Sequence, residues 1–187
     1  MPTYFGYVST FNNWSANANY WFRNKGYIDG FTCPGSGNQV VKELSIYAKS
    51  AGGTPGNIQV AIFDSSHNLL GQGVAEVTVD STIAAWVGHL TQADITPNPL
   101  TIVGGTQYDL AFAQDSNDVQ YNYTTGSAGD YTYGTTDYTG GFPATLNDGS
   151  DSVNKRPIRC GVDPAAGGLS ILQLAQSLGG NANVMTA

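Results

Sequence analysis

Apolar and polar residues alternate through most of the segment between residues 39 and 114. Four runs carry the pattern, and turns rich in Gly, Pro, Asn or Asp follow them: QVVKELSIYA, NIQVAIFD, GVAEVTV and TQYDLAFAQ. A period of two residues places every second side chain on the same face of a strand. No helical pattern interrupts these runs. The sequence therefore predicts an all-β protein whose antiparallel strands pack as a two-sheet sandwich.

The same alternation predicts which side chains point into the core of the sandwich. Within each strand, residues two positions apart share a face, and the apolar set marks the buried face. The predicted inward residues are Val40, Leu44, Ile46, Ala48, Ile58, Val60, Ile62, Ala75, Val77, Val79, Tyr108, Leu110 and Phe112.

Length and charge limit the class of protein. The chain of 187 residues suits one domain with short appendages. Its net charge is -7 with only 7 Lys and Arg, so no basic stripe exists to follow a phosphate backbone or an anionic membrane. No apolar run approaches the ~20 residues that span a bilayer. We therefore expect no nucleic-acid and no membrane partner, and the start of the chain predicts no signal peptide.

The chain divides into three predicted parts. Residues 1–26 form an irregular arm rich in aromatic side chains, residues 27–162 form the β-sandwich, and residues 163–187 form a linker and a short amphipathic helix. The helix prediction rests on apolar residues at helical spacing between Ser170, a suitable N-cap, and Gly179, a suitable stop.

Both appendages are predicted to contact another surface. A dense set of aromatic residues packs on something, and a helix of about ten residues is marginal alone in water. That surface is either the sandwich of the same chain or a neighbouring subunit. The predicted interface residues are Trp14, Tyr20, Trp21, Phe22, Ile171, Leu174 and Leu178.

The two cysteines, Cys33 and Cys160, both lie in strand-like segments near the ends of the sandwich. Alternation with their apolar neighbours points both side chains inward. They are either two buried thiols or one long-range disulfide, which would require the first and last strands to be neighbours. The missing signal peptide favours the free thiols.

No residue pattern indicates catalysis. His67 and His89 lie apart and have no neighbouring ligand pattern, and the chain contains neither HExxH nor a CxxC pair nor GxSxG. The only two glutamates, Glu43 and Glu76, lie on the polar faces of predicted strands. We therefore expect no enzyme, no catalytic residue and no cofactor.

Two loops rich in Asp and Asn could hold a hard cation such as calcium, which prefers oxygen ligands. Their spacing does not match an EF-hand, and solvated turns explain the same residues more simply. We therefore predict no metal site. The candidate ligands, should calcium bind, are Asp115, Asp118, Asp148 and Asp151.

A weakly patterned stretch between residues 125 and 155 is the predicted interaction loop, because long loops of this kind are often functional. Five tyrosines lie in or beside it: Tyr121, Tyr123, Tyr131, Tyr133 and Tyr138. Tyrosine rings stack on sugars, anchor protein interfaces, or simply cover a sheet edge. Together with Trp86 they form the candidate platform for a glycan.

Four segments resemble the small jelly-roll-like β-sandwich domains of bacteriophage virion proteins and some bacterial surface proteins. They are Val40–Tyr47, Gly56–Asp64, Leu100–Ala111 and Gly141–Leu146. The resemblance covers most of residues 27–162. It concerns strands and turns, so it bears on the fold more than on function.

The resemblance implies non-enzymatic work. We expect a virion structural protein, for capsid decoration, a fibre or a tail, that assembles in the host cytoplasm through contacts with other virion subunits and forms a homo-oligomer. The alternative is an extracellular carbohydrate-binding module that uses the loop tyrosines, with calcium as a stabilising ion.

Overall fold

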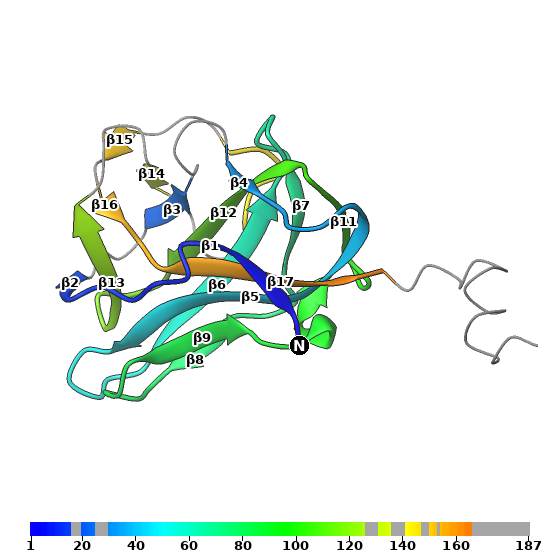
Figure 1. Ribbon diagram of the computed structural model, residues 1–187. Coiled ribbons are helices and arrows are strands. Elements are labelled where there is room, and N and C mark those ends of the chain that lie inside the picture. The colour runs from blue at the N-terminus through cyan, green and yellow to red at the C-terminus, as the bar shows by residue number, and fades with distance from the viewer. Residues whose placement is uncertain are drawn as a thin grey trace, which may run out of the picture.

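The computed structural model describes residues 1–15, 20–24, 30–125, 131–135, 141–146, 150–152 and 154–165. Strands dominate these residues and form two antiparallel sheets that pack face to face (Figure 1). The helical residues among them are one short 3-10 turn, η1 (Gln92–Asp94). The predicted all-β antiparallel sandwich is therefore confirmed.

Sheet A is organised around one strand of 14 residues, β5 (Gly37–Ser50). It pairs with β17 (Ile158–Pro164), which runs beside it in Figure 1, and with three shorter strands. These three are β9 (Ala85–His89), β11 (Thr101–Gly104) and β13 (Val119–Thr125). The sheet is completed by β1 (Thr3–Gly6) on β17 and by β2 (Asn13–Ser15) and β16 (Asn154–Lys155) on β13.

Sheet B is centred on β6 (Gly56–Phe63) and β12 (Gln107–Gln114), which pair along six residues. On the far side of β6 lie β7 (Leu69–Gly73) and β8 (Val77–Val79), and β10 (Ile95–Thr96) follows β7. On the far side of β12 lie β3 (Tyr20–Asn24), β14 (Tyr131–Thr135) and β15 (Ser150–Ser152), and β4 (Phe31–Thr32) pairs with the start of β12.

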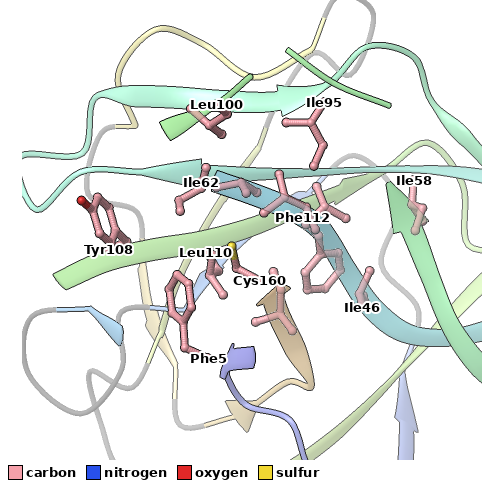
Figure 2. Close-up of a cluster of buried hydrophobic side chains, with 14 of the residues drawn as sticks. Phe5, Ile46, Ile58, Ile62, Ile95, Leu100, Tyr108, Leu110, Phe112 and Cys160 are labelled. Carbon is pink, nitrogen blue, oxygen red and sulfur yellow. The ribbon is translucent and has the colours of Figure 1, made fainter. Parts of the chain in front are cut away.

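The main core lies between the sheets and is built from the predicted alternation. Figure 2 shows Ile46 of β5, Ile58 and Ile62 of β6, and Leu110 and Phe112 of β12 directed into this space, and all five are fully buried. Burial of each such side chain contributes roughly 1.5–3 kcal/mol. The remaining predicted inward residues are also buried or half-buried, apart from one that lies outside the ladders.

A β-bulge near the start of β5 changes which residues of this strand point into the core. Gly161 pairs with Glu43 and Val162 pairs with Val41, so Lys42 is an extra residue on β5. Beyond such a bulge the faces exchange. The fully buried residue is therefore Val41, and the predicted Val40 is only half-buried. The exposed exception is Ala75, in the connection between β7 and β8.

The first 26 residues were expected to form an irregular arm, but their described parts form three strands of the sandwich. Phe5 of β1 is buried and pairs with Cys160, and β3 lies between β12 and β14 in sheet B. Six aromatic residues of this segment therefore belong to strands, and the other two, Tyr7 and Phe11, lie in the connection between β1 and β2. The sandwich begins before residue 27.

The last described strand, β17, ends at Pro164. The predicted C-terminal helix falls outside the described residues. Within the described residues, none of the helical structure is long and apolar enough to cross a membrane.

Candidate interaction surface

The outer face of sheet A carries aromatic and charged side chains. Because Leu44, Ile46 and Ala48 of β5 point into the core, the residues between them point outward. Neighbouring strands add large side chains to this face. We call six of these side chains the sheet A stripe: Tyr4 (β1), Arg159 (β17), Trp86 (β9), Tyr47 and Lys49 (β5), and Trp14 (β2).

Arg159 joins the first two rings of the stripe. Its guanidinium carbon lies 4.2 Å from the ring centroid of Tyr4 and 4.1 Å from that of Trp86. These distances allow the cation to interact with the faces of both rings. Three strands, β1, β17 and β9, are thereby linked on one face of the sheet.

Tyr47 and Trp14 continue the stripe along the sheet. Tyr47 pairs with Trp86 across β5 and β9, and their ring centroids are 5.7 Å apart in an edge-to-face arrangement. The Trp14 ring lies 6.2 Å from that of Tyr47, and the Lys49 ammonium lies 4.4 Å from the Trp14 centroid. Each contact joins consecutive members, so the stripe is continuous.

Glu43 holds the Arg159 end of the stripe in place. Its Oε1 accepts hydrogen bonds from Arg159 Nη2 at 2.6 Å and Nε at 2.9 Å, and from Ser45 Oγ at 2.6 Å. Its Oε2 accepts the Tyr4 hydroxyl at 2.8 Å. The Glu43 residue is 6% exposed, and charge-assisted hydrogen bonds of this kind are the strong ones. Burial, and then the Glu43 carboxylate, raise the pKa of Tyr4.

Gly161 makes room for the Tyr4 ring. A Cβ atom at this position would lie 2.9 Å from Tyr4 Cε1 and 3.2 Å from Glu43 Cβ. Both distances are shorter than ordinary van der Waals contact. A larger residue at this position would displace the Tyr4 ring, and glycine lets the ring lie directly over β17.

The stripe remains accessible although its members are fixed. Tyr4 is 37% exposed, the side chain of Arg159 is 19% exposed, and Trp14, Tyr47 and Trp86 are half-buried. The contacts within the stripe thus restrict the side chains without covering them. Such a surface can bind a partner without a large loss of side-chain entropy.

The outer face of sheet B is covered by its own chain. Phe63 of β6 and three alanines of β6 and β12 form a second apolar cluster with Phe142 and Leu146. The rings of Phe63 and Phe142 are 5.7 Å apart. Two backbone bonds secure residues 141–146, from Leu69 N to Ala144 O at 2.8 Å and from Leu146 N to His67 O at 3.0 Å.

Of the predicted interface residues, Trp14 lies in the stripe. The backbones of Tyr20, Trp21 and Phe22 form β3 in sheet B. The other three, Ile171, Leu174 and Leu178, fall outside the described residues. The structure therefore assigns one of the seven to the candidate surface.

Tyr121, which was predicted to be part of the glycan platform, lies in the core instead. This residue is fully buried, its ring packs 5.3 Å from that of Phe112, and the guanidinium of Arg156 lies 4.8 Å from it. Tyr121 pairs with Ala48, which also points inward, so the register of β13 on β5 explains the burial. Tyr123 is half-buried, Tyr131 and Tyr133 lie on β14, and Tyr138 falls outside the described residues.

The candidate calcium ligands do not converge where they are described. Both carboxylate oxygens of Asp115 accept bonds from Asn57, at 2.7 Å from its backbone N and 2.8 Å from its Nδ2. Asp118 is half-buried, Asp151 lies on β15, and Asp148 falls outside the described residues. Within the described ranges, no three His, Cys, Asp or Glu side chains group as metal ligands would.

Cys33 and Cys160 both point into the core, as predicted, with exposed fractions of 1% and 0%. Both are free thiols. Burial raises the pKa of each, and for Cys160 it does so most strongly. Neither thiol is therefore suited to act as a nucleophile.

Sequence reasoning missed Tyr4, Arg159 and Lys49 as parts of one surface, and Tyr47 and Glu43 with them. The available signal was the polar side of the β5 alternation, which reads Glu43, Ser45, Tyr47 and Lys49. The stripe combines the residue types that carry most binding energy at protein interfaces, so its composition is suited to recognition. A scan against protein-family models and a search of curated proteins found no match to this chain.

Proposed function

We propose that this protein is a non-enzymatic structural protein that acts through protein–protein contacts, with the sheet A stripe as one contact surface. The observation that carries the proposal is the continuous, accessible row of two tryptophans, two tyrosines and an arginine on one face of the sandwich. Trp, Tyr and Arg are the residues most enriched at interface hot spots.

The rigidity of the stripe supports the same function. Glu43 holds Tyr4 and Arg159 through three hydrogen bonds, and Ser45 donates a fourth to the same carboxylate. Immobilising a long side chain on binding costs about 0.5–1.5 kcal/mol, and here that cost is met during folding. A preorganised surface of this composition therefore binds a partner with a smaller entropic penalty.

A glycan is the second candidate partner, and the ring contacts favour it less. A cationic side chain already lies over three of the rings, at 4.1–4.4 Å from the ring centroid. Arg159 lies over Tyr4 and Trp86, and Lys49 lies over Trp14. A sugar that stacks on these rings has to use the remaining ring surface. Tyr121, the first member of the loop platform, is in the core.

The finer form of the proposal is a bacteriophage virion component, for capsid decoration, a fibre or a tail, that assembles with other virion subunits and with copies of itself. Its support is the resemblance of four segments to such domains. In the structure, Val40–Tyr47 lies in β5, Gly56–Asp64 includes β6, and Leu100–Ala111 includes β11 and part of β12. The fourth segment, Gly141–Leu146, packs on the outer face of sheet B.

The contact surface is tested on the full chain with Trp86→Ala and Trp14→Ala. Light scattering after size exclusion reports self-association, and co-sedimentation reports binding to assembled particles. We expect both variants to melt as folded proteins and to associate at least tenfold more weakly than the wild type. The matched control is Val74→Ala, a change at a 63% exposed residue away from the stripe.

A wild-type chain that stays monomeric and binds no particle contradicts the proposal. So does normal association of both tryptophan variants. A glycan array separates the second candidate, because binding there that Trp86→Ala abolishes would assign the stripe to sugars. The virion form is tested by the neighbouring genes, where portal, terminase or tail genes are expected.

A further inference from the structure

On the side of β6 that faces β7 and β8, two residues of sheet B have no partner strand, which leaves a gap between β7 and β8. On this side, β7 pairs with residues 61–63 and β8 pairs with Gly56, Asn57 and Ile58. Gln59 and Val60 fall between the two pairings, where the connection of residues 74–76 leaves the sheet. A buried backbone N–H without a partner costs free energy, so this site needs a donor or acceptor from elsewhere.

His89 fills the gap from the opposite sheet. It lies on β9 of sheet A, is 1% exposed, and its Nε2 accepts a hydrogen bond from the backbone N of Val60 at 3.3 Å. A Cβ atom at Gly73 would lie 1.8 Å from His89 Cε1. The imidazole therefore occupies the space that a side chain at Gly73 would take. The ring is a direct polar link between the two sheets.

The link requires one protonation state. Nε2 accepts a hydrogen bond from the Val60 N–H, so it carries no proton itself, and the neutral tautomer with the proton on Nδ1 is the one that fits. An imidazolium has donors on both nitrogens and would face the Val60 N–H with an N–H of its own. Protonation thus breaks the link.

The charges around His89 do not offset its burial. Among the described residues, the opposite charge that acts on His89 is Asp94 of η1. The strands β6 and β7 contain no ionisable side chain. On β5, Glu43 is bound to Arg159 on the outer face, and Lys42 donates to Gln92. Burial dominates and lowers the pKa of His89 below its usual value, although Asp94 acts in the opposite direction.

We propose that His89 is a pH-sensitive link between the sheets, closed while the imidazole is neutral and opened at the β7–β8 gap by mild acid. Gln59 Nε2, which donates to Gly73 O at 3.0 Å, closes the rest of the gap. A polar hollow of about 300 Å³, lined by Gln59, Gly73 and Glu76 among others, adjoins this site and provides water with access to the opened edge.

The sign of the effect follows from the direction of the shift. An unfolded histidine has a pKa of about 6.5, and the folded value is lower. At pH values well above about 6.5 both states are neutral and His89 causes no pH dependence. As the pH falls below that value, His89 becomes protonated in the open or unfolded state, whereas in the closed state it stays neutral. The closed state therefore loses stability until the folded pKa is passed.

The test uses the full-length protein and two nuclear magnetic resonance measurements. A nitrogen titration of the imidazoles should show His89 as the Nδ1–H tautomer, with a lower pKa than in an unfolded chain. Amide exchange, normalised to intrinsic rates, should show the protection of Val60 falling by up to about tenfold per pH unit below 6.5.

His89→Gln is the matched variant, because glutamine also offers an acceptor but does not titrate. It should remove the acid-dependent loss of protection at Val60, and His67→Gln should leave that loss unchanged. An unchanged pH profile in His89→Gln overturns the proposal. So does a wild-type His89 that is protonated at Nε2 or that titrates at or above the value for an unfolded chain, a result that does not depend on the variant's folding.

Discussion

The outer face of sheet B carries Phe63 and small apolar residues, and residues 141–146 lie over it. The outer face of sheet A carries long aromatic and charged side chains, and these bind one another within the plane of the sheet. The outer face of sheet B is thus buried under another segment of the chain, whereas the side chains on the outer face of sheet A are held by polar and ring contacts with one another. The covered face of sheet B stabilises the fold and is not accessible to a partner. The side chains on the outer face of sheet A contact one another but stay accessible to a partner.

The largest effect is expected at Phe63, which tests whether the covered face of sheet B stabilises the fold. It is fully buried and its ring packs against Phe142 on the covered face. Phe63→Ala should lower the free energy of unfolding by about 3–5 kcal/mol, measured by chemical denaturation. Val74→Ala, at an exposed position beyond β7, is the control and should change it by less than about 0.5 kcal/mol. A small effect at Phe63 would mean that the cover contributes little to folding.

Arg159 tests the lateral contacts of the other face. Its removal leaves the nearly buried Glu43 carboxylate without its cation. Arg159→Ala should lower the free energy of unfolding by about 2–3 kcal/mol. Adding Glu43→Gln should restore part of the loss, because the unpaired charge is then removed. If the single variant is as stable as the wild type, Arg159 does not hold the stripe together.

Tyr4 offers a finer test of the same network. Tyr4→Phe keeps the ring that faces Arg159 and removes only the hydroxyl that donates to Glu43 Oε2. We expect a loss of about 1 kcal/mol in the free energy of unfolding. Tyr47→Phe, which keeps the ring contacts with Trp86 and Trp14, is the matched control. Equal losses in the two variants would argue against a specific role for the Tyr4–Glu43 bond.

Leu174→Asp tests whether the C-terminal segment resembles residues 141–146 in covering its own sandwich. Two alanines and two glycines at 165–168 precede this segment, and a linker of this kind gives reach without imposing a direction. Because such a linker suits contact with a neighbouring subunit, we expect no change in melting temperature and a weaker assembly, measured by calorimetry and light scattering. Normal assembly with a melting temperature several degrees lower would instead place the segment on its own core.

The local parts of the fold could be predicted from the sequence because strand alternation is a local property. Residues two apart share a face whatever the partner strand is, so Ile58, Val60 and Ile62 were correctly placed inward. The inward direction of Cys33 and Cys160 followed from the same rule. The bulge at Lys42 was not predictable in this way, because it exists only in the pairing of β5 with β17.

The candidate site was decided by tertiary structure. Glu43 and Arg159 are 116 positions apart, and Tyr4 is 39 positions from Glu43. They meet because β1, β17 and β5 are neighbours in one sheet, and strand order is set by long-range pairing that alternation does not encode. For the same reason the sequence placed Tyr121 beside the interaction loop as part of a glycan platform, whereas the register of β13 on β5 decided that its ring is in the core.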